Sequence, residues 1–303
     1  MTVLPDTSVV LCTRERPALV ADSIDSVLSG RSLPEELVIV DQSETSNLGL
    51  SSRKETSGCR WNYVHSLSRG LSRARNEGAR LARHSIIVFA DDDELADPAW
   101  LEELVGALLE SSPDTVVTGR VIAAPPEAPG GYAPAVRTDL EPRVYRGRVH
   151  VDPLVTGNMA IHRRTFEAVS GFDPRLGAGT AFPGAEDNDF GFRLLEAGYT
   201  IRYVPEAVLQ HRAWRDGASY RTLRRGYGRG QGAFFAKHAS LRDPFMLRRM
   251  IGRLARVLGR VPRRIVRRRD LARGDVAYVV GAISGFAEWL WRRLPDEGGL
   301  EQG

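Results

Sequence analysis

Short apolar runs recur along the first part of the chain and predict a series of buried strands. Each run is rich in valine, isoleucine or aromatic residues and is followed by polar or turn-forming residues, which is typical of strands in the core of an α/β protein. The predicted strands are "SVVLC" (8–12), "ELVIVDQS" (36–43), "WNYVH" (61–65) and "SIIVFA" (85–90).

The segments between these runs carry apolar residues at helical spacing. "PALVADSIDSVLSG" (17–30) starts with a proline and ends with a glycine, which is the usual punctuation of a helix. "LSRARNEGARLARH" (71–84) and "PAWLEELVGALLES" (98–111) also fit, the latter beginning at Pro98 with Asp97 as its N-cap. Strands that alternate with helices favour a mostly parallel sheet with helices on both faces.

The pattern is less regular after residue 111. "TVVTGRVIAAPPEAPGGYAPAV" (115–136) predicts a strand followed by a Pro/Gly/Ala-rich surface loop near residues 123–136. "GNMAIHRRTFEAVSGFD" (157–173) predicts a strand and a short helix that ends at Gly171. A helix that opens with acidic residues, from Glu186 to Gly198, and a strand around Ile201 and Tyr203 follow.

Polar residues stand where three of the predicted strands end. "TRERP" (13–17) follows the first strand, Asp41 ends the second, and Asp91, Asp92 and Asp93 follow the fourth. Because ligands of open α/β sheets bind beyond the carboxyl ends of the strands, this edge is the predicted site. In an extended chain Asp91 and Asp93 would point to one side and Asp92 to the other.

The aspartate triplet has two explanations. Adjacent carboxylates repel one another, and burial strengthens the repulsion, so the triplet is either a solvated turn or a cation site. Mg²⁺ and Mn²⁺ favour such hard oxygen ligands, above all where substrate phosphates complete the shell. The acids at the start of the 186–198 helix also have a simple explanation, since they suit the helix dipole.

Composition describes an ordinary globular protein with an uneven charge. The chain has 303 residues, 42% of them hydrophobic and 26% charged, which is enough for one large α/β domain or for one domain plus an appendage. The two cysteines show no metal or redox spacing, and neither a basic-apolar leader nor an apolar stretch of roughly 18 residues is apparent, so a cytoplasmic protein is expected.

The C-terminal region is strongly basic. Between Arg212 and Arg273, 19 Lys and Arg face three acidic residues, a local +16 that leaves −12 for the rest of a chain of net charge +4. Such asymmetry indicates a polyanionic partner. Pro262 is expected to interrupt this helical region, and a second apolar helix is expected from Val276 to Trp291. The residues predicted on one apolar face are Leu247, Met250, Ile251, Leu254, Leu258 and Val261.

Six stretches, taken together and in order, resemble glycosyltransferase family 2. The resemblance implies a GT-A fold for residues 1–212, with a nucleotide-sugar half (about 1–95) and an acceptor half (about 96–212), followed by an Arg-rich helical region at 213–303. The stretches are "SVVLCTRERP", "LVIVDQS", "GLSRARNEGAR", "IIVFADDDEL", "TGNMAIHRRTFEAVSGFD" and "GAEDNDFGFRLLEAGYTIRYVPEAVLQH".

The resemblance also implies how the donor is bound. Asp41 would hydrogen-bond the base, and Asp91 and Asp93, as the Asp-X-Asp of the family, would hold Mn²⁺ or Mg²⁺ on the donor diphosphate with His211 completing the metal site. The metal would act as a Lewis acid on the leaving group. The implied donor-binding residues are Thr13, Arg14, Arg16, Asp41, Arg73, Arg75, Asn76, Asp91, Asp92 and Asn158.

On the acceptor side the resemblance implies that Asp187 is the general base and that Glu186 supports it. A single displacement of this kind inverts the anomeric centre. The expected donor is a UDP- or dTDP-sugar, and the expected acceptor is a glycan or lipid-linked hydroxyl in cell-envelope or extracellular polysaccharide synthesis. A sugar nucleotidyltransferase is disfavoured because "TRERPALV" is not a glycine-rich loop.

The basic region leaves three alternatives open. Its arginines and apolar face, with Trp289 and Trp291, suit an anionic membrane surface and a peripheral location on the inner face of the plasma membrane. It could equally pack on the catalytic domain. Nucleic acid is disfavoured because aromatic residues are sparse among the arginines. A transferase-like scaffold without turnover, or a polyanion-binding protein, is the alternative function.

Overall fold

The computed structural model describes residues 2–51, 58–126, 133, 135–212 and 216–292. The chain divides into two compact units, one formed by Met1–Thr180 with Glu186–Asp216 and the other by Ala181–Ala185 with Gly217–Gly303. Within the described ranges, no helix combines the length and the apolar character that crossing a membrane requires.

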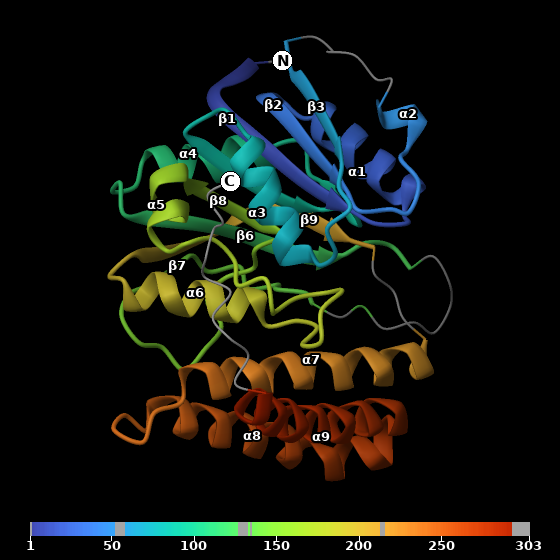
Figure 1. Cartoon of the computed structure of the whole chain (residues 1–303), viewed down its shortest axis with the longest axis vertical. Helices are drawn as coiled ribbons and strands as arrows, with labels where there is room; N and C mark the ends of the chain where they lie inside the picture. Colours follow the sequence, from blue (N-terminus) through green and yellow to red (C-terminus); the bar gives the residue numbers. More distant parts are fainter. Residues whose placement is uncertain (1, 52–57, 127–132, 134, 213–215, 293–303) are drawn as a thin grey trace. The chain divides into compact units, whose positions relative to one another are not determined.

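The first unit is built on a mixed sheet, in which nine strands lie within the described residues (Figure 1). The order is β3-β2-β1-β4-β8-β6-β9-β5, with β7 also paired to β9. The strands are β1 (Thr2–Thr13), β2 (Ser32–Asp41), β3 (Arg60–His65), β4 (Ile86–Asp91), β5 (Glu94–Ala96), β6 (Thr115–Ala123), β7 (Arg143–Tyr145), β8 (Asn158–His162) and β9 (Thr200–His211).

The expected parallel arrangement holds for the four strands of the N-terminal half. β3, β2, β1 and β4 are parallel neighbours, whereas β8 is antiparallel to both β4 and β6. A parallel pair needs a crossover connection, usually a helix. The described residues between β6 and β8 form no helix, and the chain returns antiparallel there. Of the predicted loop at 123–136, residues 127–132 and 134 lie outside the described residues.

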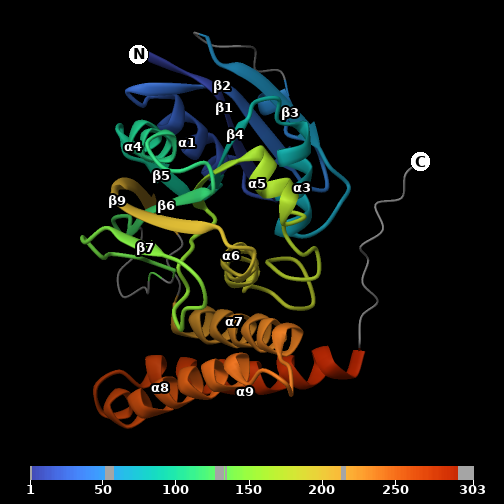
Figure 2. The same cartoon turned by 90° about the vertical axis from the view of Figure 1, so that its left-hand side faces the viewer.

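Helices cover both faces of this sheet, as the alternating strands predicted. Val9 and Leu11 of β1 face a core shared with α1 and α4, while Val10 of the same strand faces the opposite core, shared with α3, α5 and α6. Figure 2 shows α1 and α4 on one side and α3 and α5 on the other. The helices are α1 (Pro17–Leu28), α2 (Leu48–Ser51), α3 (Leu71–Leu81), α4 (Trp100–Leu109), α5 (Arg163–Ala168) and α6 (Glu186–Glu196).

The start of α4 differs from its prediction by two residues. The helix begins at Trp100, not at Pro98, and Ala99 occupies the N-cap position. Asp97 instead closes a turn, in which its carboxylate accepts a hydrogen bond from the Ala99 amide at 3.0 Å and its carbonyl accepts one from the Trp100 amide at 2.9 Å. Asx turns of this kind compete with the helix for the same backbone groups.

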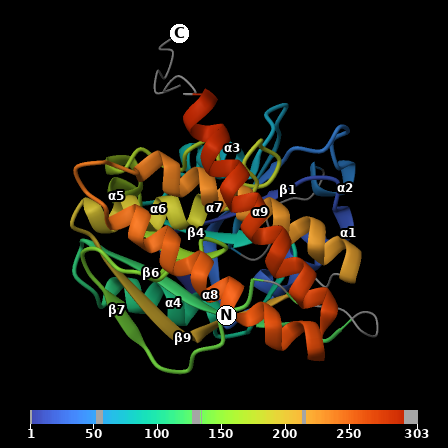
Figure 3. The ribbon, with the colours of Figure 1, turned by 90° about the horizontal axis from the view of Figure 1, so that it is seen from below.

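The second unit consists of α7 (Gly217–His238), α8 (Phe245–Arg267) and α9 (Arg269–Arg292). α9 packs against both α7 and α8 (Figure 3). The interruption expected at Pro262 is wrong, since α8 continues through it. Proline removes one helical hydrogen bond, but packing holds the helix on both sides of it: Val257 is buried, and Arg264 binds Asp275 of α9 at 2.7 Å.

Glycines bring the backbones of α7 and α9 into contact. A Cβ atom on Gly232 would lie 2.0 Å from the Ala282 carbonyl oxygen, and one on Gly281 would lie 2.2 Å from that of Arg225. No side chain fits at either position. The glycine-rich "YGRGQGAFF" (227–235) is therefore explained by helix packing.

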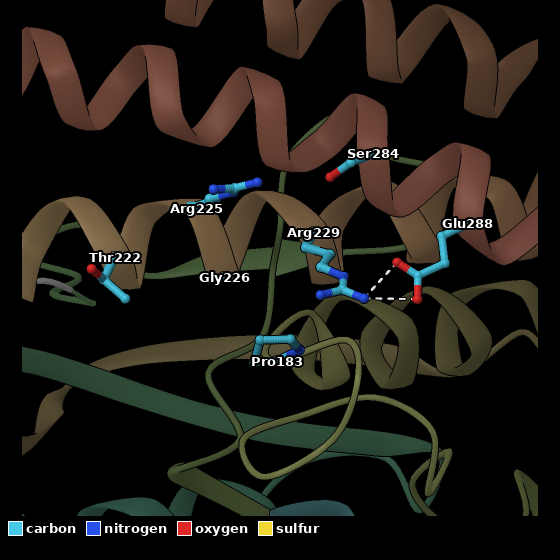
Figure 4. A pocket seen from close by; sticks show the side chains of 7 residues that line it. All are labelled: Pro183, Thr222, Arg225, Gly226, Arg229, Ser284 and Glu288. Atoms are coloured by element: carbon cyan, nitrogen blue, oxygen red, sulfur yellow. Dashed lines mark hydrogen bonds and ion pairs between the residues drawn. The ribbon is translucent and has the colours of Figure 1, made fainter.

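A pocket of about 380 Å³ opens beside this helix pair (Figure 4). Arg229 lies on its α7 side and binds Glu288 of α9 at 2.7 Å, so this wall of the pocket carries a neutralised pair. The lining residues are Pro183, Thr222, Arg225, Gly226, Arg229, Ser284 and Glu288.

The contact of α3 with β1 can be tested at Gly78. An alanine there would place its Cβ 2.4 Å from Cγ1 of Val10, so Gly78→Ala should lower the free energy of unfolding by about 1–3 kcal/mol through overpacking. Gly106→Ala on α4, where a Cβ meets nothing within 4 Å, is the matched control and should raise it by roughly 0.5–1 kcal/mol. Urea unfolding measures both; equal effects would refute the close contact.

Candidate active site

The carboxyl ends of β1, β2 and β4 meet at one edge of the sheet. The register pairs Thr13 with Asp41 and Cys12 with Asp91, so the polar residues that end these strands are neighbours. Asp41 is buried, and its carboxylate accepts hydrogen bonds from the Tyr63 hydroxyl at 2.7 Å and the Ser43 amide at 2.9 Å. Burial and the bond to Asp41 raise the pKa of Tyr63 to about 12.

The aspartate triplet does not alternate as an extended strand would. Asp91 ends β4, but Asp92 and Asp93 form a turn before β5, and both bind the same Nη1 atom of Arg16 at 3.0 Å. The Thr13 hydroxyl also donates a hydrogen bond to Asp92, at 2.7 Å. The expectation that Asp92 points to the opposite side from Asp93 is therefore wrong, because both carboxylates turn toward Arg16.

His211 is the last residue of β9 and lies beside the turn formed by Asp92 and Asp93. β5 and β9 are antiparallel with Glu94 opposite His211, and the Arg212 amide donates to the Asp93 carbonyl at 2.8 Å. This register places Nε2 of His211 3.4 Å from Oδ1 of Asp93. The structure thus brings together two of the three expected metal ligands.

The third expected ligand, Asp91, faces Arg75 of α3. The Arg75 side chain is only 2% exposed, and it lies 2.5 Å from Asp91 and 2.6 Å from the Thr156 hydroxyl. The same guanidinium lies 3.6 Å from a carboxylate oxygen of Glu186 and 3.6 Å from one of Asp187. One buried cation therefore joins α3, the end of β4, the segment before β8 and the start of α6.

Glu186 and Asp187 form a carboxylate pair with an unsatisfied site. Burial and the adjacent Asp187 raise the pKa of Glu186 to about 7, although Arg75 opposes the shift. Burial also raises the pKa of Asp187, against the opposing effects of Arg75 and of the Thr156 hydroxyl, which donates a hydrogen bond to it. Oε2 of Glu186 is buried and has no hydrogen-bond partner among the residues that the structure describes. Asp187, at 33% side-chain exposure, remains accessible from solvent.

The chemistry of this edge fits a divalent cation, although the described residues contain no preformed group of three His, Cys, Asp or Glu ligands. Asp93 and His211 supply a carboxylate and an imidazole side by side. Burial raises the pKa of Asp92 to about 6, and burial with the Asp91 charge raises that of Glu94 well above its ordinary value. Several buried carboxylates lie close together here, and a bound cation would offset their negative charge.

Two expected donor-binding residues are used elsewhere. Asn158 is fully buried, and its amide accepts a bond from the Trp100 indole and donates to the carbonyls of Arg120 and Ala207. Asn76 bonds both the amide and the carbonyl of Phe172. These bonds fix the backbone around each amide, and donor contact by either residue stays a prediction. Arg14 is half-buried and Arg73 is exposed.

Three side chains at this edge were not predicted. Glu94, buried beside Asp91, directly follows the aspartate triplet, so an acid in that position was the available signal. Thr156 precedes Asn158 in "TGNMA", and Tyr63 lies on β3 beside β2. Neither position carries a signal that distinguishes it from an ordinary polar or aromatic residue.

The central role of Arg75 predicts a pH-dependent loss of stability. In Arg75→Gln, Glu186 and Asp187 lose their cation, so their folded pKa values rise further above the unfolded ones. Folded acids of raised pKa bind more protons than unfolded ones, so their contribution to stability falls as pH rises. We expect a loss of about 3 kcal/mol or more at pH 7.5 and a smaller loss at pH 5, measured by urea unfolding.

Arg80→Gln, an exposed arginine on the same helix, is the matched control and should change stability by less than about 0.5 kcal/mol at either pH. A deficit in Arg75→Gln that stays the same at both pH values would contradict the coupling to these two carboxylates.

Comparison with known proteins agrees with this architecture. A sequence model of glycosyl transferase family 2 matches residues 8–168, and one described as the N-terminal domain of galactosyltransferase matches residues 138–213. The glucosyl-dolichyl phosphate glucuronosyltransferase of Haloferax volcanii is 28% identical over 238 residues, 73% of this chain and 75% of that protein.

Two solved structures share the fold at low sequence identity. The mannosyltransferase PcManGT from Pyrobaculum calidifontis, in complex with GDP-Man and Mn²⁺, is 16% identical, with a TM-score of 0.63 over 94% of this chain and 88% of that one. TarS 1–349 of S. aureus, in complex with UDP-GlcNAc, is 12% identical, with a TM-score of 0.55 over 94% of this chain and 91% of that one. With a family model matched over more than half of its 303 residues, the chain belongs to glycosyltransferase family 2 and has the GT-A fold.

Proposed function

We propose that the protein is a metal-dependent, inverting hexosyltransferase that moves a sugar from a nucleotide-sugar donor to an acceptor hydroxyl. The observation that carries the proposal is the convergence of two acidic groups, Asp91–Glu94 and Glu186–Asp187, on either side of the buried Arg75. One group suits the metal and diphosphate of a donor, and the other suits a base for an acceptor.

In this proposal Asp93 and His211 would hold Mn²⁺ or Mg²⁺, with Asp91 as the third expected ligand. The metal supplies Lewis-acid stabilisation of the negative charge on the departing nucleoside diphosphate. Arg16, which binds Asp92 and Asp93, is placed to contact the same diphosphate because its side chain is 41% exposed. The Mn²⁺ in the PcManGT structure supports the choice of a divalent ion.

Asp187 is proposed as the general base. It would accept the proton of the acceptor hydroxyl as that oxygen attacks the anomeric carbon, and one displacement with one base gives inversion. Its carboxylate is oriented by the Thr156 hydroxyl and kept ionised by Arg75. Burial raises the pKa of Asp187, and a carboxylate of higher pKa is a stronger base. The same burial therefore aids proton transfer from the acceptor hydroxyl.

The donor and acceptor are proposed only by class. Asp41, held by Tyr63, would hydrogen-bond the base of a UDP- or dTDP-sugar. The structural neighbours carry GDP-Man and UDP-GlcNAc, which supports a nucleotide-sugar donor. The acceptor is proposed to be a glycan or a lipid-linked hydroxyl in cell-envelope or extracellular polysaccharide synthesis. The Haloferax relative is named a glucosyl-dolichyl phosphate glucuronosyltransferase, which supports a lipid-linked acceptor.

The alternative is a transferase-like scaffold, or a polyanion-binding protein, without turnover. The exposure of Asp187 beside a buried Glu186 oxygen without a hydrogen-bond partner argues against it, because a scaffold gains nothing from such an oxygen.

The base assignment predicts a defect in chemistry without a defect in donor binding. Asp187→Asn should lower kcat by about 10²- to 10⁴-fold while leaving donor affinity within about threefold, since an amide cannot accept the proton. The measurement is release of nucleoside diphosphate with a panel of sugar and lipid-linked acceptors, with NMR of the product anomer.

Glu196→Gln at the end of the same helix is the matched control, because Glu196 binds Arg148 away from the aspartate turn. It should retain full activity. Wild-type turnover in Asp187→Asn, or a product with retained configuration, would refute the assignment.

A further inference from the structure

The outer faces of α8 and α9 carry apolar residues at helical spacing. On α8, Ile251, Leu258 and Ile265 recur every seven residues and are 66%, 49% and 52% exposed. α8 and α9 lie side by side (Figure 3). The exposed large apolar residues on α9 are Val276, Val280, Ile283, Leu290 and Trp291.

The expected apolar face of α8 is split between the inside and the outside of the unit. Met250 and Leu254, predicted on the same face as Ile251, are half-buried, whereas Ile251 is exposed. Packing against α9 and α7 therefore accounts for only part of the apolar surface. The outer part forms what we call the apolar strip, composed of Ile251, Leu258, Ile265, Val276, Val280 and Ile283.

The exposed arginines of α8 border the other edge of its exposed face from Ile251, Leu258 and Ile265, because the two sets lie roughly half a turn apart at 3.6 residues per turn. Between Phe245 and Arg292 there are 12 arginines and three acidic residues, and the acids are already paired: Asp275 with Arg264, Glu288 with Arg229 and Asp270 with Arg273. The exposed arginines of α8 at three- and four-residue spacing are Arg256, Arg260, Arg263 and Arg267.

We infer that the apolar strip and these arginines form a docking surface for an anionic lipid bilayer, on which α8 and α9 lie flat. An apolar face beside a cationic one is the arrangement of interfacial helices, whose side chains enter the headgroup region while arginines contact lipid phosphates. Trp291, 89% exposed at the end of α9, is a residue type that favours the same interface.

Two other partners, a second copy of the chain and a nucleic acid, match this surface less well than an anionic bilayer does. A second copy of the chain would bring two arginine-rich surfaces together, and their repulsion disfavours a dimer. A nucleic acid would satisfy the arginines, but it would leave the apolar strip exposed to water. Only an anionic bilayer matches both features at once. The inference deepens the proposed function, because it would bring a lipid-linked acceptor within reach, but it is tested without any transfer reaction.

The test uses the full chain and vesicles of phosphatidylcholine, either alone or with about 30% phosphatidylglycerol. We expect sedimentation with the anionic vesicles, at least tenfold weaker binding to the neutral ones, and weakening by salt. The emission of Trp291 should shift to the blue on binding, and Trp291→Phe should remove that shift.

Two sets of substitutions separate the contributions. Val280→Glu with Ile283→Glu, and separately Arg256→Glu with Arg260→Glu and Arg263→Glu, should each weaken anionic-vesicle binding by about tenfold or more. All five positions face outward, and thermal unfolding checks that the variants fold. Leu109→Glu, at a 61% exposed leucine of α4, is the matched control and should bind as the wild type does.

Three outcomes would overturn the inference. The first is vesicle binding that neither set of substitutions weakens, or no vesicle binding by a folded protein. The second is tight, salt-sensitive binding to duplex DNA that the arginine set abolishes and the apolar set leaves intact. The third is lipid-free self-association that the apolar set abolishes. Transfer activity can fail or succeed independently of all three.

Discussion

The candidate active site depends on one buried cation. Arg75 leaves water almost completely, and burying an arginine is costly unless its charge is met by carboxylates and its donors by acceptors. Asp91, Thr156, Glu186 and Asp187 meet that requirement from three other segments of the chain. The start of α6 and the end of β4 are therefore held together at the carboxyl edge of the sheet, which is where a GT-A fold binds its ligands.

The same interaction sets the electrostatics of the edge. Arg75 and Arg16 offset the carboxylates nearest to them, but burial and mutual repulsion raise the pKa values of Asp92, Glu94, Glu186 and Asp187 by more than these arginines lower them. A site with buried negative charge in excess is prepared for a cation before the cation arrives. In the proposed function, Asp93 and His211 would hold the metal, which would supply part of this positive charge.

Much of this arrangement was predictable from the sequence, and the reason differs between residues. Parallel strands put their carboxyl ends together, so the proximity of Thr13, Asp41 and Asp91 followed from the apolar runs alone. The approach of His211 to Asp93 rests on the β5–β9 register, which no local pattern encodes and only the family resemblance implied. The facing of Asp92 and Asp93 was mispredicted because a two-residue turn replaces the extended chain. The bonds of Asn76 and Asn158 to the backbone were not predicted, because the position of an amide in the sequence does not tell which groups it binds.

Calorimetry can measure the binding of nucleoside diphosphates and nucleotide sugars to the wild-type protein, each with Mn²⁺ and with a chelator. If the carboxylates around Arg75 bind a cation and, through it, a diphosphate, one nucleotide should bind with Mn²⁺ and lose at least about tenfold in affinity with the chelator. Binding of no nucleotide by the folded protein, or equal binding with and without metal, would contradict the claim.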